Sequence, residues 1–167
     1  MSEAAVPADS EELPEPVSRW STVQPWLTLL VRLGLAGIFG VAGYLKVADP
    51  AGAVQSVQAY QLFPPELAQI IGYALPFAEL ALALLLVIGL APRLVAVASA
   101  LVLLAFIGGI ISAWAKGLSI DCGCFGTGGK VKPGEERYLE DILRDVGFLA
   151  LAAWIYLWPR SKFSLDG

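Results

Sequence analysis

The stretch LVAVASALVLLAFIGGIISAWA, residues 94–115, decides the fold because it contains no charged residue. A helix that crosses a membrane needs about 20 mostly apolar residues, so this stretch is long enough to cross once. Two further apolar stretches precede it, at 26–44 and 67–90. Each contains one charged residue, Arg32 in the first and Glu79 in the second. The sequence therefore predicts three transmembrane helices in this part of the chain.

A fourth apolar stretch, at 139–158, has its charged residues confined to its first third. Only residues 146–158 are free of charge, and that length is too short to cross a membrane alone. We therefore expect Arg144 and Asp145 to lie at or below the membrane interface. With this stretch included, the sequence predicts an all-α integral membrane protein, a bundle of four transmembrane helices.

The composition excludes several classes of function. The chain of 167 residues is 57% hydrophobic and 16% charged, whereas soluble domains are about 45–50% apolar and about 25% charged. The formal net charge of −4 argues against a nucleic-acid binder, which needs a basic face. The absence of histidine excludes Ser-His-Asp catalysis, and two cysteines are too few for an ordinary iron–sulfur cluster. Any chemistry in this chain therefore depends on its two cysteines.

The segments around the four stretches are expected to differ in structure. Residues 1–24 form an acidic tail that we expect to be disordered and cytoplasmic, because few apolar side chains are available to offset the entropy of ordering. Residues 49–63 carry apolar side chains at helical spacing with glutamines opposite, which predicts a short interfacial helix. Residues 25–158 are then the transmembrane domain, and residues 159–167 are a short C-terminal tail.

The connection between the third and fourth stretches contains both cysteines, in the run SIDCGCFG at residues 119–126. Gly123 can take backbone angles closed to other residues, which lets the sulfurs of Cys122 and Cys124 meet. One interpretation is a structural disulfide, although closing so short a ring gains only about 1.6 kcal/mol. Two thiolates also suit a Cu(I) ion, and inert cysteines are a further alternative. A pair that exchanges electrons is the interpretation we favour, because strained disulfides are labile and oxidising.

Several charged residues accompany this pair. Asp121 either accepts a thiol proton or caps a turn. Charges inside a membrane mark function or specific pairing, so we expect Arg32 and Glu79 to pair between helices. This pair either has a structural role or lines a polar cavity or proton path. Asp145 is expected to point towards the cysteine loop, with Arg144 beside it. The catalytic candidates are thus the cysteines and Asp121. The candidates for binding a cofactor are Arg32, Glu79, Arg144 and Asp145, and no metal site is predicted.

Three runs of sequence resemble a known family. RLGLAGIFGVAGYLK at 32–46 resembles the first membrane span of DoxX-like proteins, and LPFAEL at 75–80 resembles their second. The CGCFG run at 122–126, followed by Leu-Arg-Asp at 143–145, is similar to the methylamine utilisation protein MauE branch of that superfamily. The position of the CGCFG run between the third and fourth spans is the most specific part. The resemblance covers about residues 25–158.

The resemblance implies a four-helix membrane protein linked to thiol–disulfide chemistry outside the cytoplasm, since MauE is implicated in maturing a disulfide-rich periplasmic dehydrogenase subunit. The architecture is also similar to quinone-linked disulfide-forming enzymes and to vitamin K epoxide reductase, many of which use two cysteine pairs. Here one pair deals with both electron acceptor and partner, or the partner brings further cysteines. We therefore expect Cys122 and Cys124 to exchange electrons between the quinone pool and an extracytoplasmic thioredoxin-like or disulfide-rich protein.

Two other classes of function fit the same residues. One is a non-enzymatic membrane subunit or assembly factor of a larger respiratory or maturation complex, in which the cysteines are structural. The other is a small carrier or ion-binding protein that uses Glu79 and Arg32. The orientation is not decided by charge, because four basic residues flank one side of the bundle and five flank the other. Disulfides persist outside the cytoplasm, so we expect a plasma-membrane protein with cytoplasmic termini and an extracytoplasmic cysteine loop.

Overall fold

The computed structural model describes residues 18–125 and 128–165, and this part of the chain is mostly helical. Within it lie five helices and one short two-stranded sheet. In chain order the elements are α1 (Arg19–Ala48), α2 (Pro50–Ala59), α3 (Pro65–Ile88), α4 (Pro92–Ala115), β1 (Ile120–Asp121), β2 (Gly129–Lys130) and α5 (Tyr138–Leu157). The helices α3, α4 and α5 begin and end within two residues of the stretches that the sequence predicts.

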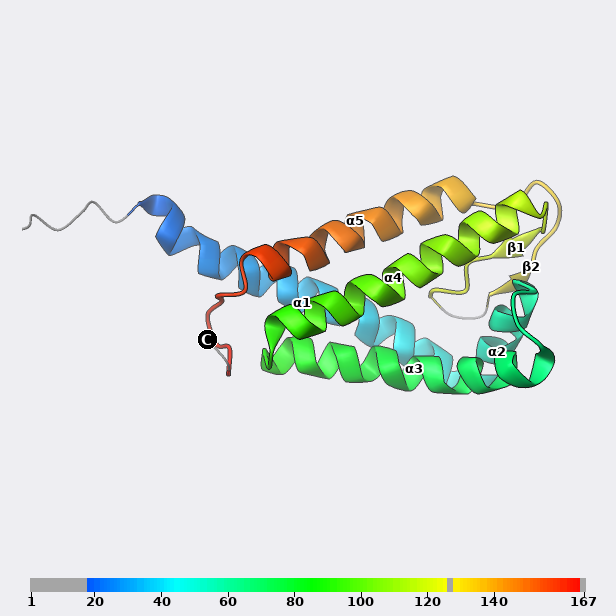
Figure 1. Ribbon diagram of the computed structural model, residues 1–167, viewed down its shortest axis with the longest axis horizontal. Coiled ribbons are helices and arrows are strands. Elements are labelled where there is room, and N and C mark those ends of the chain that lie inside the picture. The colour runs from blue at the N-terminus through cyan, green and yellow to red at the C-terminus, as the bar shows by residue number, and fades with distance from the viewer. Residues whose placement is uncertain (1–17, 126–127, 166–167) are drawn as a thin grey trace, which may run out of the picture.

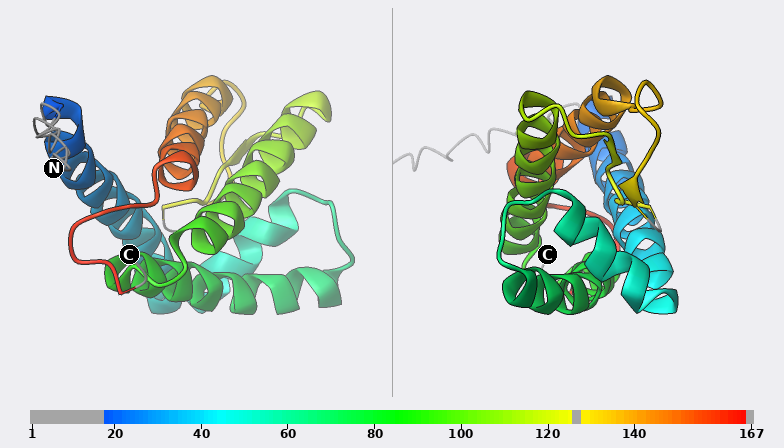
Figure 2. Two further views of the ribbon diagram at one scale, coloured as in Figure 1. Left: turned by 60° about the vertical axis from the view of Figure 1, so that its left-hand side comes forward. Right: turned by 90° about the vertical axis from the view of Figure 1, so that its right-hand side faces the viewer.

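The four long helices lie side by side with alternating directions (Figure 1). α1 packs against α3 and α5, α4 packs against α5, and α2 lies across α3. Viewed from the end in Figure 2, α2 and the two strands lie together at one end of the bundle. Opposite this end, the Thr28 hydroxyl donates a hydrogen bond to the carbonyl of Trp158 at 3.2 Å. The beginning of α1 and the end of α5 therefore meet at the end that lacks the cysteines.

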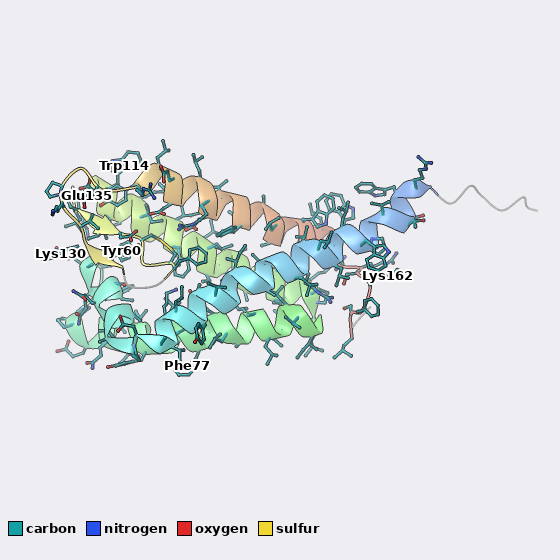
Figure 3. All side chains as sticks on the ribbon, turned by 180° about the vertical axis from the view of Figure 1, so that it is seen from behind. Tyr60, Phe77, Trp114, Lys130, Glu135 and Lys162 are labelled. Atoms are coloured by element: carbon teal, nitrogen blue, oxygen red, sulfur yellow. A yellow bond between two sulfur atoms is a disulfide. The ribbon has the colours of Figure 1, made fainter. Side chains whose placement is uncertain are left out.

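Among the described residues, three helices, α1, α3 and α4, are long and apolar enough to cross a membrane. Large apolar side chains such as Phe77 point outward from the bundle (Figure 3), and Phe77 is 65% exposed. Such an apolar exterior suits contact with lipid rather than water. The protein is thus a multi-pass membrane protein. Length and composition alone do not place α5 among the spans, because its first turns carry acidic and basic residues.

Helix α1 begins earlier than expected. Residues 19–24, which the sequence assigns to a disordered tail, are helical, whereas residues 1–17 lie outside the described part. The Ser18 side chain accepts a hydrogen bond from the backbone N–H of Trp20 and caps the helix. The Trp20 ring also packs edge-on against Trp154 of α5, with ring centroids 6.2 Å apart. A cap and a contact between distant helices thus extend α1 through the segment before Pro25.

The buried apolar residues form two clusters along the bundle. The larger cluster joins α1, α3, α4 and α5 around Leu35, Phe39 and Leu86. The smaller cluster lies at the end that carries the strands, and it includes both cysteines together with Ile110 and Tyr138. The cysteine loop is therefore packed as part of the hydrophobic core, and it is fixed against the helices that it connects.

The position of α2 depends on a glycine in α3. A Cβ atom added at Gly72 would lie 2.6 Å from the Cα atom of Val54 in α2. A contact this short with backbone cannot be relieved by rotating a side chain. Glycine at this position is what lets α2 lie against α3 and reach the cysteine loop.

The first prediction concerns this contact. Gly72→Ala should lower the free energy of unfolding by about 1–3 kcal/mol, because α2 must move away from α3. Thermal unfolding in detergent measures the change. Gly147→Ala is the matched control, since no heavy atom lies within 4 Å of its added Cβ, and its effect should stay within about 0.5 kcal/mol. Equal melting temperatures for Gly72→Ala and wild type would show that the two helices are not in close contact.

Candidate functional site

Cys122 and Cys124 form a disulfide in a tight turn of the loop between α4 and α5. β1 and β2 pair antiparallel, with Ile120 opposite Lys130, and this pairing brings the two sides of the loop together. Gly123 has a φ of +67°, and an added Cβ would lie 2.8 Å from both side-chain atoms of Ser56. Left-handed backbone and lack of space both require glycine here. The expectation that Gly123 lets the sulfurs meet is confirmed.

The loop is held by side chains from the helices around it. The Tyr60 hydroxyl donates a hydrogen bond to the Cys122 carbonyl at 2.8 Å. The Tyr138 hydroxyl donates to the Leu118 carbonyl and accepts from the Ile120 amide. Burial, followed by the nearby carboxylates, raises the pKa of Tyr60 well above its usual range. Tyr60 therefore keeps its proton and remains a donor to the cysteine loop at any ordinary pH.

A buried ion pair joins this loop to the bundle. The Lys46 ammonium of α1 donates to both carboxylate oxygens of Glu79 in α3, at 2.8 and 3.0 Å. It also donates to the carbonyl of Cys124 at 2.8 Å. Lys46 is 4% exposed and Glu79 is 0% exposed. Since an ammonium has three N–H groups, all of its donors are used. Lys46 therefore connects α1, α3 and the disulfide at a single point.

Two charged residues of α5 approach the sulfurs. The Arg144 guanidinium lies 3.7 Å from Cys122 Sγ and forms ion pairs with Asp141 at 3.0 Å and Asp145 at 3.4 Å. Asp145 is 1% exposed. One of its carboxylate oxygens and the two cysteine sulfurs all lie within 4.8 Å of one another. A cation and a carboxylate are thus both placed where charge on a thiolate would appear.

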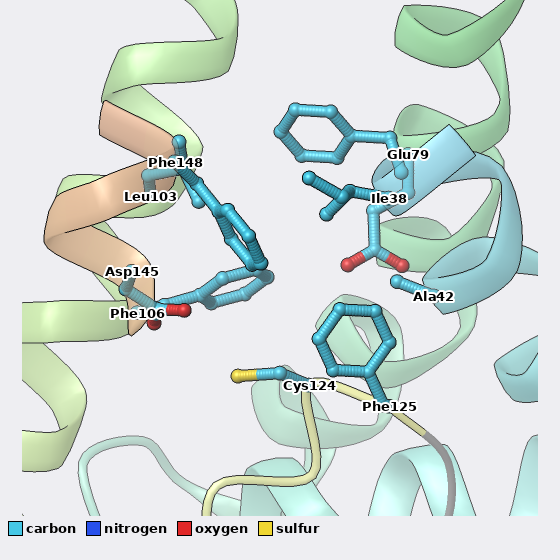
Figure 4. Close-up of a pocket in the computed structure, with 10 residues that line it drawn as sticks. Ile38, Ala42, Glu79, Leu103, Phe106, Cys124, Phe125, Asp145 and Phe148 are labelled. Carbon is cyan, nitrogen blue, oxygen red and sulfur yellow. The ribbon is translucent and has the colours of Figure 1, made fainter. Parts of the chain in front are cut away.

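Two hollows adjoin the disulfide. A cavity of about 220 Å³ is lined by Lys46, Tyr60, Phe63 and Phe106 and by both cysteines, and its walls are mostly apolar. A smaller pocket of about 10 Å³ lies deeper in the bundle (Figure 4). There the carboxylates of Glu79 and Asp145 enter from opposite sides, with Cys124 between them. This smaller pocket is about large enough to hold one water molecule.

The ligand set around the sulfurs is incomplete for a structural zinc site. Two thiolates and the Asp145 carboxylate make three ligands, one short of the four in a structural zinc site. These thiolates exist only when the disulfide is reduced. The Arg144 guanidinium beside Cys122 also repels a cation. The described residues around the sulfurs therefore do not form a complete structural zinc site.

The expected pairing of Arg32 with Glu79 is wrong. Glu79 pairs with Lys46 instead. Arg32 is buried at the other end of the bundle, where it donates to the Ser161 hydroxyl at 2.6 Å and to the Phe163 carbonyl at 3.0 Å. Arg32 of α1 and Glu79 of α3 lie at different heights along the bundle. The segment after α5 folds back and provides the partners of Arg32.

The candidate residues are therefore divided in space. Glu79, Arg144 and Asp145 lie around the cysteine pair, whereas Arg32 does not. Asp121 is exposed on β1, and the carboxylate that faces the sulfurs is that of Asp145. Lys46 and Tyr60 are site residues that were not among the candidates predicted from the sequence. A lysine just beyond the first predicted span, on the side of the cysteine loop, was the available signal for Lys46.

The family model described as methylamine utilisation protein MauE matches residues 24–158. The chain belongs to the MauE family. The match covers the elements that build the site, from α1 to α5, except for the first five residues of α1. No curated protein and no solved structure matches the chain. The resemblance to MauE drawn from the CGCFG run is confirmed.

The second prediction concerns the buried ion pair of this MauE-family protein. Lys46→Met should lower the free energy of unfolding by about 3–5 kcal/mol, because Glu79 would stay buried without its partner. The double variant Lys46→Met with Glu79→Leu should lose much less, since no unpaired charge remains. Chemical unfolding in detergent measures both changes.

The matched control is Lys130→Met, which removes an exposed lysine from the same region and should change stability by less than about 0.5 kcal/mol. If Lys46→Met is no more destabilising than Lys130→Met, Lys46 does not anchor the loop.

Proposed function

We propose that this MauE-family protein is a membrane thiol–disulfide redox component. It exchanges electrons between an extracytoplasmic thioredoxin-like or disulfide-rich protein and a quinone, through the Cys122–Cys124 pair. One observation carries the proposal: a disulfide between neighbouring cysteines lies at one end of the membrane helices, with a cation against one sulfur and an apolar cavity beside both. A disulfide that only stabilised the loop would need neither the cation nor the cavity.

The proposal includes an arrangement in the membrane. In it α5 is the fourth transmembrane helix, and the kinship with MauE extends to the wider DoxX-like superfamily. The charges of the first turns of α5 are then at the interface or inside the bundle, where Arg144 pairs with both Asp141 and Asp145. The cysteine loop faces outward from the plasma membrane, where disulfides persist. The termini are in the cytoplasm, and α2 lies in the interface.

The cavity beside the disulfide supports the quinone part of the proposal. Its walls include the rings of Tyr60, Phe63 and Phe106, against which a flat ring can stack. Its volume of about 220 Å³ is below the range of about 300–1,000 Å³ for typical ligand pockets, so it suits a single ring rather than a larger ligand. Both cysteines lie in its wall, so a quinone ring bound in the cavity would lie directly against the pair.

The redox steps balance with a single cysteine pair. The two thiols of Cys122 and Cys124 give two electrons and two protons to the quinone, and the S–S bond of the pair forms, with quinol as the other product. A dithiol of the partner then reduces this disulfide through a mixed disulfide, and the partner's own disulfide forms. The net direction is set by the reduction potentials of the partner and the quinone relative to that of the pair.

The third prediction tests this exchange. Membranes or detergent-purified protein should oxidise reduced thioredoxin when a short-chain ubiquinone is added. The double variant Cys122→Ser with Cys124→Ser should reduce this rate to that of the uncatalysed reaction, because no sulfur remains to carry the electrons. The assay counts thioredoxin thiols over time, and circular dichroism checks that the variant keeps its helical content.

Full exchange by the double variant would overturn the proposed function. Wild-type protein that exchanges no faster than the uncatalysed reaction would also overturn it and would favour the non-enzymatic subunit, in which the disulfide only holds the loop. The carrier interpretation has lost its main support, since Glu79 and Arg32 do not form a pair.

A further inference from the structure

Asp145 has the surroundings of a proton-carrying group. Its Oδ1 atom accepts hydrogen bonds from Arg144 at 3.4 and 3.5 Å. Its Oδ2 atom is buried and has no hydrogen-bond partner among the described residues. An ionised carboxylate oxygen buried without a donor is costly. A proton on Oδ2 removes that cost and gives the group a proton to donate.

The position of Asp145 gives this proton a destination. A carboxylate oxygen of Asp145 and both cysteine sulfurs lie within 4.8 Å of one another. The chain has no histidine, the residue that most often transfers protons in proteins. Asp121, the acid adjacent to the pair in sequence, is exposed on the protein surface. The carboxyl of Asp145 is therefore the acid best placed to exchange a proton with a thiol.

Arg144 makes the two sulfurs unequal. Its guanidinium lies 3.7 Å from Cys122 Sγ and also lies over the ring of Phe125, at 5.1 Å from the centroid. A nearby cation stabilises a thiolate. Cys122 is therefore the sulfur better able to leave as a thiolate when the disulfide opens, and Cys124 is the sulfur that a thiolate attacks.

We propose that Asp145 donates a proton to Cys122 when the disulfide opens and takes it back when the disulfide closes. This inference rests on the proposed function, and it deepens that function by assigning the proton carrier and the role of each sulfur.

The step balances in atoms and charge. A thiolate of the thioredoxin-like partner bonds to Cys124 Sγ, the S–S bond breaks, and its electron pair leaves on Cys122 Sγ. The proton on Asp145 moves to Cys122. The negative charge that the partner brought then rests on the Asp145 carboxylate, beside Arg144. In the reverse step Cys122 returns its proton to Asp145 and attacks Cys124, which releases the partner thiolate.

The groups that face Asp145 define what else can influence its proton. They are Arg144 and Asp141 of α5, Lys46 of α1, Glu79 of α3 and Tyr60 after α2. The residues of α4 that line the smaller pocket, Leu103 and Phe106, are apolar. Lys46 and Glu79 satisfy each other, and Tyr60 keeps its proton. The guanidinium of Arg144 has donors only and no atom that accepts a proton. Asp145 is thus the group in this set with a buried carboxylate oxygen that has no hydrogen-bond partner among the described residues.

The test is the rate at which dithiothreitol reduces the disulfide of the full-length protein in detergent, followed by thiol alkylation and mass shift. The rate constant is divided by the concentration of dithiothreitol thiolate at each pH. For wild type we expect this corrected constant to fall as the pH rises and Asp145 loses its proton. Asp145→Asn should be slower by about 10²-fold, the usual contribution of general acid catalysis, and its corrected constant should not change with pH.

Two further variants separate a proton carrier from a structural residue. Asp145→Glu keeps an acid near the sulfurs and should restore most of the rate together with the pH dependence. Glu140→Gln, which changes an exposed acid of the same helix to its amide, should match wild type. A structural role for Asp145 would not give a pH profile that disappears in the amide variant and returns in the acid variant.

The outcomes distinguish this inference from the proposed function. If the wild-type disulfide opens but its corrected rate constant does not vary with pH, Asp145 is not the proton donor, even where Asp145→Asn fails to fold. Wild-type rates in Asp145→Asn would overturn the inference in the same way and leave the redox function intact. A wild-type disulfide that never opens would overturn both.

Discussion

The Lys46 ammonium is the contact on which the arrangement of the site depends. Its three donors bind the two oxygens of Glu79 and the carbonyl of Cys124, so one buried cation joins α1, α3 and the cysteine loop. Burying a charge is costly unless it is paired and hydrogen-bonded, and here every donor has a partner. The loop cannot move away from the bundle without leaving a buried ammonium incompletely bonded. This constraint keeps the disulfide against the helices.

The other features of the site follow from that position. With the loop held down, α5 brings Arg144 and Asp145 to the sulfurs, and α2 brings Tyr60 to the Cys122 carbonyl. The apolar cavity lies between these elements and has both cysteines in its wall. A short Cys-Gly-Cys turn on its own would be a small, solvated disulfide. Within this fold it is a buried disulfide with a cation, an acid and an apolar cavity beside it, which is the combination that the proposed chemistry needs.

The bounds of α3, α4 and α5 could be predicted closely from the sequence, because apolar length is a local property of the chain. The start of α1 could not, because its first turn is held by a cap and by a contact with α5. The turn at Gly123 was predictable because the backbone freedom of glycine is also a local property. The partners of charged residues were not, since pairing depends on the rotation and height of each helix. Glu79 binds Lys46 rather than Arg32, and Asp145 rather than Asp121 faces the sulfurs. Lys46 resembled an ordinary interfacial lysine because it follows the first predicted span, and only the packed structure shows it buried.

The central claim is that Cys122 and Cys124 exchange electrons reversibly with both a thiol partner and a membrane quinone. The most direct measurement is the redox state of these two cysteines in native membranes, by alkylation and mass shift across a graded thiol buffer, with and without quinone. We expect one reversible two-electron transition and a larger oxidised fraction when quinone is present. A disulfide that never opens, or thiols that stay reduced in the presence of quinone, would contradict it.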